Sequence, residues 1–303
     1  MGHQAANART LRPTLARVRA LAAFWLGGCL LLGGSLAAAA GSSAELAFSR
    51  HSEPVATRDI AWLRSAVPMR AVRVIDPYEE AEVEFEAFAF DAVLDAVYGR
   101  SWREEEEVLF HCRDGYQPTV PVERILEHRA QLAFARRDRA DFTLRKRESG
   151  VLKQIDLAPF YLVWENLDDT RLRAEGDYGW PYQLIALDLI RARDHFPKMA
   201  PDLSAPAVVQ AGFAVFRVHC SRCHAINGEG GSVGPELNGP TPAAIHRDTA
   251  WLRRWIDDPS RVLPTARMER LNPALPERER AIDEVIRYLQ AMASAKTEAR
   301  DGN

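Results

Sequence analysis

The chain is 303 residues long, which is enough for about two domains and a targeting segment. Apolar residues make up 47% of it and charged residues 27%, which indicates buried cores and argues against a membrane protein with several spans. The formal net charge is −3, so binding to nucleic acid has no electrostatic support and we expect no nucleic-acid partner.

Residues 1–40 have the pattern of a secretory signal. An uncharged apolar run from Ala20 to Ala40 follows four arginines, namely Arg9, Arg12, Arg17 and Arg19. The run ends in three alanines that suit cleavage of a signal peptide, but it is also long enough to stay as a membrane anchor. Cys29 follows Leu26-Gly27-Gly28 and resembles a lipidation site. We expect a periplasmic protein, either soluble or anchored to the inner membrane through residues 20–40.

The next two segments differ in their hydrophobic pattern. Residues 41–65 are polar and irregular, which predicts a linker that leads into a short first helix. Residues 66–200 mix strand-like and helical patterns, so we expect an α+β accessory domain. Val83, Phe85 and Ala87 alternate with glutamates, as in a half-buried strand. Further strands are expected at Val72–Val74, Val108–Phe110, Phe160–Trp164 and Tyr182–Ile190, and helices at Asp91–Tyr98 and Val122–Leu132.

Part of this accessory domain is similar to a known family. Val108–Tyr116, Phe160–Val163 and Trp180–Gln183 resemble the C-terminal part of the sulfite-oxidase-like molybdopterin-binding domain, over about Val72 to Leu189. The family's metal-binding cysteine lies earlier, and this chain has no cysteine between Ala44 and His111. The resemblance therefore implies a degenerate relative without the molybdenum cofactor. His111, Cys112 and Asp114 could form a site, but a structural role is favoured because neighbouring strand residues point to opposite faces.

Pro197, Pro201 and Pro206 mark the expected boundary between this domain and a second one at residues 205–295. Amphipathic patterns at Val208–Val218 and Ala281–Met292 predict two helices that could cross at Gly212. Residues 296–303 are expected to form a polar tail. The second domain is thus predicted to be all-α.

Cys220, Cys223 and His224 form a C-x-x-C-H motif, which is typical of covalent c-type haem attachment. Two thiols at this spacing can add to the two vinyl groups of one porphyrin, and the histidine then becomes the proximal ligand. A zinc site would need two further ligands, yet no second pair of this kind follows. A thiol redox pair would need no histidine here. We expect one covalent haem c, with His224 as a metal ligand.

Residues 208–293 resemble a class I c-type cytochrome. The resemblance rests on Gly212, Phe216 and Cys220 at four-residue spacing, on the haem motif, on Gly234–Gly239, and on Tyr288. It implies that Pro235 accepts a hydrogen bond from the proximal imidazole and so raises its basicity.

The same resemblance implies a methionine as the sixth ligand. Met268 lies 44 residues after His224, although Glu269 stands where the family often has proline. His246, or an open sixth position, are the alternatives. Trp255, one helical turn after Trp251, matches an aromatic residue that faces the haem in this family, and ordinary core packing is its alternative.

Together these features predict a periplasmic mono-haem cytochrome that carries single electrons between periplasmic redox proteins and a respiratory-chain donor or acceptor. A six-coordinate iron leaves no open position, so we expect no enzyme activity and no catalytic residues. Two alternatives stay open. The chain could be the electron-accepting haem subunit of a sulfite-type dehydrogenase, or a haem-based sensor of redox state or gas.

Overall fold

The computed structural model describes residues 44–148 and 151–301 of the chain. The predicted signal or anchor at residues 1–40 lies outside these described residues. Among the helices of the described part, none has both the length and the apolar character that a membrane span needs. All the described residues belong to one compact unit.

The prediction of a linker at residues 41–65 is wrong for the part that the structure describes. Two strands, β1 (Glu45–Arg50) and β2 (Glu53–Asp59), precede the predicted short helix α1 (Ile60–Ala66). Leu46 and Phe48 alternate on one face of β1 and are buried in the core. Asp59 caps α1, because its Oδ1 accepts a hydrogen bond of 2.7 Å from the backbone N–H of Trp62.

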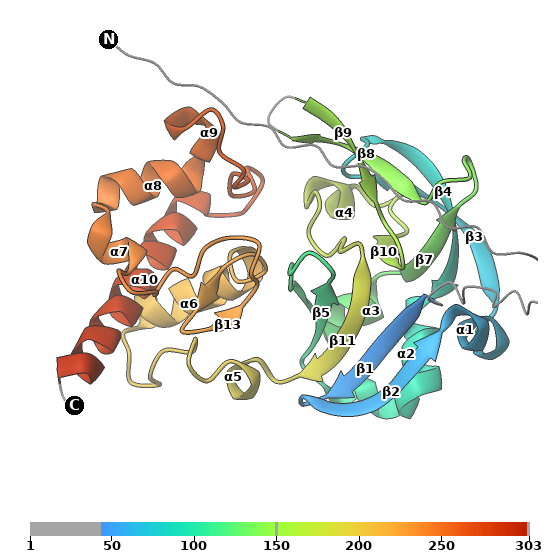
Figure 1. Ribbon diagram of the computed structural model, residues 1–303, viewed down its shortest axis with the longest axis horizontal. Coiled ribbons are helices and arrows are strands. Elements are labelled where there is room, and N and C mark those ends of the chain that lie inside the picture. The colour runs from blue at the N-terminus through green and yellow to red at the C-terminus, as the bar shows by residue number, and fades with distance from the viewer. Residues whose placement is uncertain (1–43, 149–150, 302–303) are drawn as a thin grey trace, which may run out of the picture. The chain divides into compact units, whose positions relative to one another are not determined.

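The first sheet has five strands in the order β2-β1-β11-β5-β6 (Figure 1). The strands β11, β5 and β6 span Leu184–Ile190, Glu107–Cys112 and Thr119–Pro121. Pairing of β1 with β11 is parallel, whereas the other pairs are antiparallel. The sheet therefore joins segments that lie more than a hundred residues apart in sequence.

The second sheet has the order β10-β7-β4-β3. These strands span Tyr161–Trp164, Ala130–Arg136, Ala81–Ala89 and Met69–Asp76. Val83, Phe85 and Ala87 are buried, which confirms the predicted alternation. A separate hairpin of β8 (Thr143–Glu148) and β9 (Val151–Asp156) lies between β7 and β10 in sequence.

The helices of this domain are short. Besides α1, they are α2 (Phe90–Tyr98), a 3₁₀ helix (Gly99–Glu104), α3 (Val122–Glu127), α4 (Thr170–Ala174) and α5 (Ala192–His195). The helix predicted at Val122–Leu132 ends at Glu127, and Ala130 begins β7 instead. The reason is tertiary pairing, because Ala130–Leu132 form ladder pairs with β10 and are buried.

The C-terminal region is helical, as predicted. Its helices are α6 (Ala207–His219), α7 (Ala243–His246), α8 (Thr249–Asp257), α9 (Pro259–Val262) and α10 (Arg278–Asp301). A minimal hairpin joins β12 (Ala225–Ile226) to β13 (Glu229–Gly230). The backbone of residues 296–301, predicted as a polar tail, continues α10.

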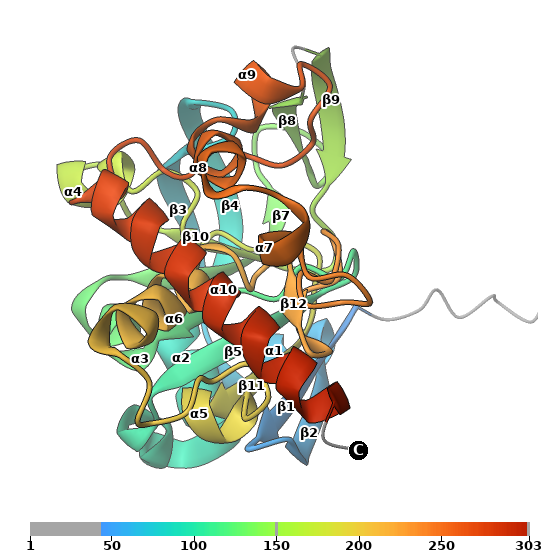
Figure 2. The same cartoon turned by 90° about the vertical axis from the view of Figure 1, so that its left-hand side faces the viewer.

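The long helix α10 crosses α6 at Gly212 (Figure 2). A Cβ atom at residue 212 would overlap the backbone carbonyl of Glu284 and the side chain of Tyr288. Only glycine lets the two helices approach this closely. The Tyr288 hydroxyl also donates a 2.8 Å hydrogen bond to the carbonyl of Met199, which ties α10 to the segment before α6.

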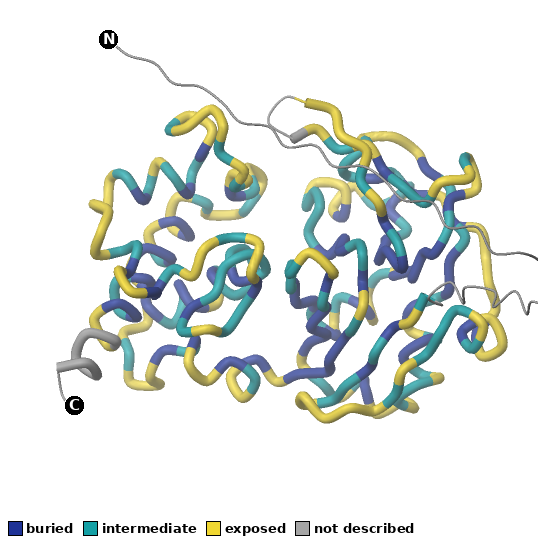
Figure 3. Tube along the Cα trace, viewed as in Figure 1, coloured by how far each residue is buried: buried dark blue, intermediate teal, exposed yellow. Residues whose placement is uncertain are grey.

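The two regions meet across the first sheet. One face of that sheet belongs to the core of the N-terminal domain, while Leu109 on β5 and Ile190 on β11 belong to the core of the helical region. Figure 3 shows that buried residues run along both strands. An ion pair between Glu107 and Arg217 links β5 to α6. The helical region is thus built directly onto the N-terminal domain.

Candidate haem site

A cavity of about 1270 Å³ opens within the helical region and reaches the N-terminal domain. This volume exceeds the roughly 300–1,000 Å³ of most small-molecule pockets. All six residues that the sequence singled out line it, namely Cys220, Cys223, His224, Pro235, Trp255 and Met268. Residues from four different segments therefore surround one space.

The attachment motif forms a tight turn at the end of α6. Cys220 accepts backbone hydrogen bonds from Cys223 at 3.0 Å and from His224 at 2.9 Å, and its own N–H donates to Phe216 at 2.8 Å. This turn brings both thiols and the imidazole to the same cavity wall. The local spacing alone produces that arrangement, because all of these bonds lie within nine residues.

The two thiols are partly buried in the cavity wall. Burial raises the pKa of Cys220 to about 12 and that of Cys223 to about 11. A thiol redox pair works through a thiolate of lowered pKa. Zinc binding also requires thiolates, and no group of three or more metal-binding side chains occurs among the described residues. These surroundings favour thioether attachment over both alternatives.

His224 is held in one orientation from the side opposite its free nitrogen. Its Nδ1 donates a 2.8 Å hydrogen bond to the backbone carbonyl of Pro235. Burial lowers the pKa of His224, and the bond to Pro235 offsets part of that effect. The ring is therefore neutral and keeps Nε2 for a metal ion. Gly234 lies so close to the ring that a Cβ there would overlap it.

Met268 lies in an irregular segment between α9 and α10 and is half-buried in the cavity wall. Its thioether is a soft, neutral donor that suits haem iron. His246, the alternative ligand, lines the same cavity from α7. The wall thus contains both residues that the sequence analysis considered.

Two tryptophans form one side of the cavity. Trp251 and Trp255 stack with their ring centroids 5.1 Å apart and their planes at 11°. Asp248 caps α8 by accepting a 2.7 Å hydrogen bond from the N–H of Trp251. The guanidinium of Arg247 lies 4.5 Å from the ring of Trp251. The start of α8 therefore fixes an aromatic wall beside the thiols and the imidazole.

These observations fit a covalent haem. The cavity is large, its donors are two thiols, a neutral imidazole and a thioether, and one wall is aromatic. Leu252, Ile256, Val285 and Leu289 line the remainder of the helical side. An apolar planar cofactor would bury its faces against such a surface.

Sequence reasoning missed the contribution of the N-terminal domain to the cavity. Residues of that domain that line it include Tyr78, Asp114, Tyr116, Lys146, Asp177 and Tyr182. No local pattern indicates that the segment around Asp114 and Gly115 contacts the haem motif. The N–H of Gln117 donates a 2.8 Å hydrogen bond to the carbonyl of Arg222, between the two motif cysteines.

Electrostatics tie the two sides of the cavity together. Lys146 donates a 2.7 Å hydrogen bond to Glu269, the residue after Met268. Burial disfavours the ammonium, but attraction to Glu269 outweighs this and raises the pKa of Lys146. Arg222 donates a 3.2 Å hydrogen bond to the Tyr116 hydroxyl. Both segments with candidate haem ligands therefore contact the N-terminal domain.

At the candidate site of His111, Cys112 and Asp114, the last two residues have surroundings that suit a structural role. Cys112 is buried, and burial raises its pKa well above the ordinary 9.0. Asp114 accepts a 3.0 Å hydrogen bond from the N–H of Tyr116 and so shapes the turn. A thiol in this state is inert, and the carboxylate is used by the backbone.

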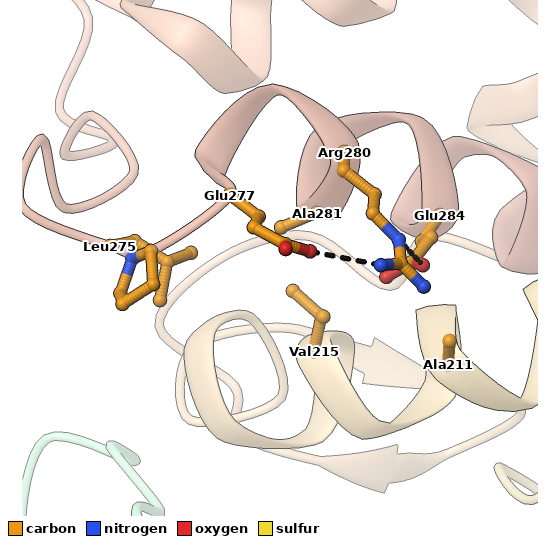
Figure 4. Close-up of a pocket in the computed structure, with 8 residues that line it drawn as sticks. Ala211, Val215, Leu275, Glu277, Arg280, Ala281 and Glu284 are labelled. Carbon is orange, nitrogen blue, oxygen red and sulfur yellow. Dashed lines mark hydrogen bonds and ion pairs between the residues drawn. The ribbon is translucent and has the colours of Figure 1, made fainter.

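A second pocket, of about 280 Å³, lies between α6 and α10 (Figure 4). Arg280 pairs there with Glu277 at 2.9 Å and with Glu284 at 2.8 Å. These are i,i+3 and i,i+4 pairs, which commonly stabilise helices. The pocket is a feature of the helix crossing and lies outside the haem site.

Comparison with known proteins agrees with this geometry. Residues 209–292 match the family model of cytochrome c. A search of curated proteins found no match to the chain. The resemblance of the N-terminal domain to the molybdopterin-binding domain stays a prediction. The chain therefore contains a cytochrome c domain at residues 209–292, preceded by an α/β domain whose family is unidentified.

Proposed function

We propose that this protein is a periplasmic mono-haem cytochrome that carries single electrons between redox partners. A cytochrome c domain implies haem-based electron transfer. One observation carries the finer proposal: two thiols, an imidazole and a thioether, from Cys220, Cys223, His224 and Met268, line the same cavity. That donor set would suit one covalent haem whose iron takes two ligands from the chain.

Each of these residues has a separate role in the proposal. Cys220 and Cys223 would form the thioethers that tether the cofactor, and His224 would offer Nε2 to its iron. The Pro235 carbonyl accepts a hydrogen bond from Nδ1–H, which holds the ring and increases its basicity. Met268 would offer its thioether sulfur as a second ligand to the iron. When bound, the haem supplies the exchange of one electron at its iron.

The side chains around the haem would set its reduction potential. Aliphatic side chains of α8 and α10 exclude water from the cavity wall and lower the local dielectric constant. A neutral thioether donor favours the reduced metal more than a second imidazole would. Both effects come from the chain and raise the reduction potential.

The proposed location is the periplasm, in soluble form or anchored by residues 20–40. Support comes from the arginine-flanked apolar run and from the haem motif, since covalent haem attachment takes place outside the bacterial cytoplasm. The proposed partners are a periplasmic redox protein and a respiratory-chain donor or acceptor.

The proposal is tested by denaturing the purified protein and extracting it with acid and acetone. We expect the colour to stay with the polypeptide, and iron analysis to give one iron per chain. Colour that moves into the acetone would contradict covalent attachment. A stoichiometric molybdenum signal in the same sample would favour the alternative of a sulfite-type dehydrogenase subunit.

A further inference from the structure

The segment that carries Met268 has little regular structure of its own. It runs from residue 263, after α9, to residue 277, before α10. Irregular segments of this length are uncommon in compact domains and are usually functional. Because such a segment has many alternative conformations, contacts must select the one that places Met268 in the cavity wall.

Contacts with the N-terminal domain flank the methionine on its C-terminal side. The carboxylate of Glu269 accepts a 2.7 Å hydrogen bond from the ammonium of Lys146. Three residues further on, the Asn272 amide donates a 3.3 Å hydrogen bond to the carbonyl of Glu175. Within the cytochrome c domain, the backbone N–H of Leu271 donates a 3.3 Å hydrogen bond to the carbonyl of Ile256. The nearest of these side-chain contacts is thus made directly beside Met268.

Lys146 is itself well placed to hold this contact. It lies on β8, and only 18% of its side chain is exposed, whereas 52% of the Glu269 side chain is exposed. Its ammonium also lies 4.8 Å from the centre of the Tyr78 ring. A partly desolvated ammonium loses more than a surface lysine when its carboxylate partner leaves. The pair therefore resists outward movement of the segment.

The same domain also contacts the proximal side of the cavity. Arg222, between the two motif cysteines, donates a hydrogen bond to Tyr116, and its carbonyl accepts one from Gln117. The N–H of Ser232 donates a 3.0 Å bond to Gly115. Both candidate ligand segments are therefore held by contacts with the same N-terminal domain.

We propose that Lys146 is a positioning residue of the haem centre, which holds Met268 at the iron through its ion pair with Glu269. This inference rests on the proposed ligation by His224 and Met268. The N-terminal domain then keeps the iron six-coordinate. An external ligand binds only while Met268 is dissociated, so its apparent affinity reports the population of that open state.

Imidazole titration of the oxidised holoprotein tests the proposal. Loss of the near-infrared sulfur-to-iron charge-transfer band gives the fraction of Met268 displaced. In Lys146→Met we expect the apparent affinity for imidazole to rise about three- to tenfold, because the open state becomes more populated. Lys146→Arg keeps the charge and should stay close to the wild type.

Lys198 provides a control of the same residue type. It is exposed and does not line the cavity, so Lys198→Met removes one positive charge away from the proposed haem site. We expect that variant to change the imidazole affinity less than about twofold. The charge-swapped double variant, Lys146→Glu with Glu269→Lys, should return most of the wild-type affinity.

Two results separate the inference from the function on which it rests. An intact sulfur-to-iron band with unchanged imidazole affinity in Lys146→Met would overturn the role of Lys146 alone. A wild-type protein without that band would overturn ligation by Met268 itself. If Lys146→Met fails to retain haem, Glu269→Gln removes the same ion pair from the loop and must give the same increase.

Discussion

The N-terminal domain is filled by its own side chains, whereas the cytochrome c domain surrounds a cavity. In the first, three tryptophans, Trp102, Trp164 and Trp180, are fully buried among aliphatic residues. In the second, aliphatic side chains of α8 and α10 line a space of about 1270 Å³. The first core is complete as a polypeptide, and the second needs a cofactor to fill it.

The polar groups differ in the same way. The N-terminal domain buries an ion pair of Arg136 with Glu79 and a hydrogen bond of 2.8 Å from Tyr161 to Asp76. These groups satisfy one another within the domain. In the cytochrome c domain, His224 and Met268 line the cavity, and Nδ1 of His224 is bonded to Pro235. The buried pairs of the N-terminal domain therefore serve packing, whereas these two side chains are available to a ligand.

The largest effect should follow from loss of both tethering thiols. The double substitution Cys220→Ser with Cys223→Ser removes covalent attachment and leaves the second core unfilled. We expect complete loss of covalent haem and loss of hydrogen-exchange protection in α6, α8 and α10, with protection kept in β4 and β7. Cys112→Ser is the control and should retain haem. Native hydrogen-exchange protection of α6 without haem would show that the helical core does not need the cofactor to fold.

The second-largest effect, a loss of folding stability, is expected within the N-terminal core. Arg136→Met removes the closest partner of the buried Glu79 carboxylate, since their side chains are 1% and 4% exposed. Arg139 at 3.4 Å and Arg145 at 3.9 Å remain beside that carboxylate, so we expect a loss of about 3 kcal/mol in the free energy of unfolding, the lower end for a broken buried pair. Urea denaturation followed by circular dichroism measures it, while the haem spectrum should not change.

The matched control for this variant is an exposed pair. Arg73 contacts Glu82 at 2.8 Å, and both side chains are about half exposed. We expect Arg73→Met to cost less than about 1 kcal/mol. Equal losses for the two arginines would mean that burial does not determine the strength of these pairs.

The helix crossing should show an intermediate effect. In Gly212→Ala the new methyl group meets the backbone of Glu284, so α6 and α10 must separate. Overpacking of this kind lowers the free energy of unfolding by about 1–3 kcal/mol, and we expect the loss in the cytochrome c domain. Thermal unfolding of the holoprotein measures it, with Ala214→Ser on the exposed side of α6 as the control. A variant as stable as the wild type would contradict the close approach.

The smallest effect concerns the pH dependence of stability. Burial raises the pKa of Asp76 above its ordinary value of 3.8, despite the hydrogen bonds from Glu79, Tyr161 and Tyr78. The folded state therefore holds this proton more tightly than the unfolded state, and stability falls as the pH rises above that value. In Asp76→Asn this contribution is absent.

The difference in unfolding free energy between Asp76→Asn and the wild type should thus increase with pH, starting near pH 4. Urea denaturation at several pH values measures the difference. A difference that decreases with pH would show that the hydrogen bonds to the carboxylate outweigh its burial.

Much of the haem site could be predicted because the residues of its main motif lie close together in sequence. Cys220, Cys223 and His224 lie on one turn, so their spacing alone brings them together. Family resemblance then led to Pro235 and Met268, which line the same cavity. The crossing of two helices at Gly212 could be predicted because a glycine within an apolar helix face allows another helix to approach closely.

The remainder depends on pairing between distant segments, which a single sequence does not reveal. Residues 45–50 read as a linker because only Leu46 and Phe48 alternate there, yet pairing with β2 and β11 makes them an interior strand. Lys146 and Tyr116 reach the haem cavity only because the N-terminal domain packs against the cytochrome c domain. Nothing in their local patterns indicates that contact.

The account is tested most directly by the near-infrared spectrum of the oxidised holoprotein. We predict a sulfur-to-iron charge-transfer band in the wild type, its disappearance in Met268→Ala, and its retention in Met292→Leu, where the other downstream methionine is buried in α10. A wild-type protein without the band, or a Met268→Ala variant that keeps it, would contradict ligation of a haem in this cavity by His224 and Met268.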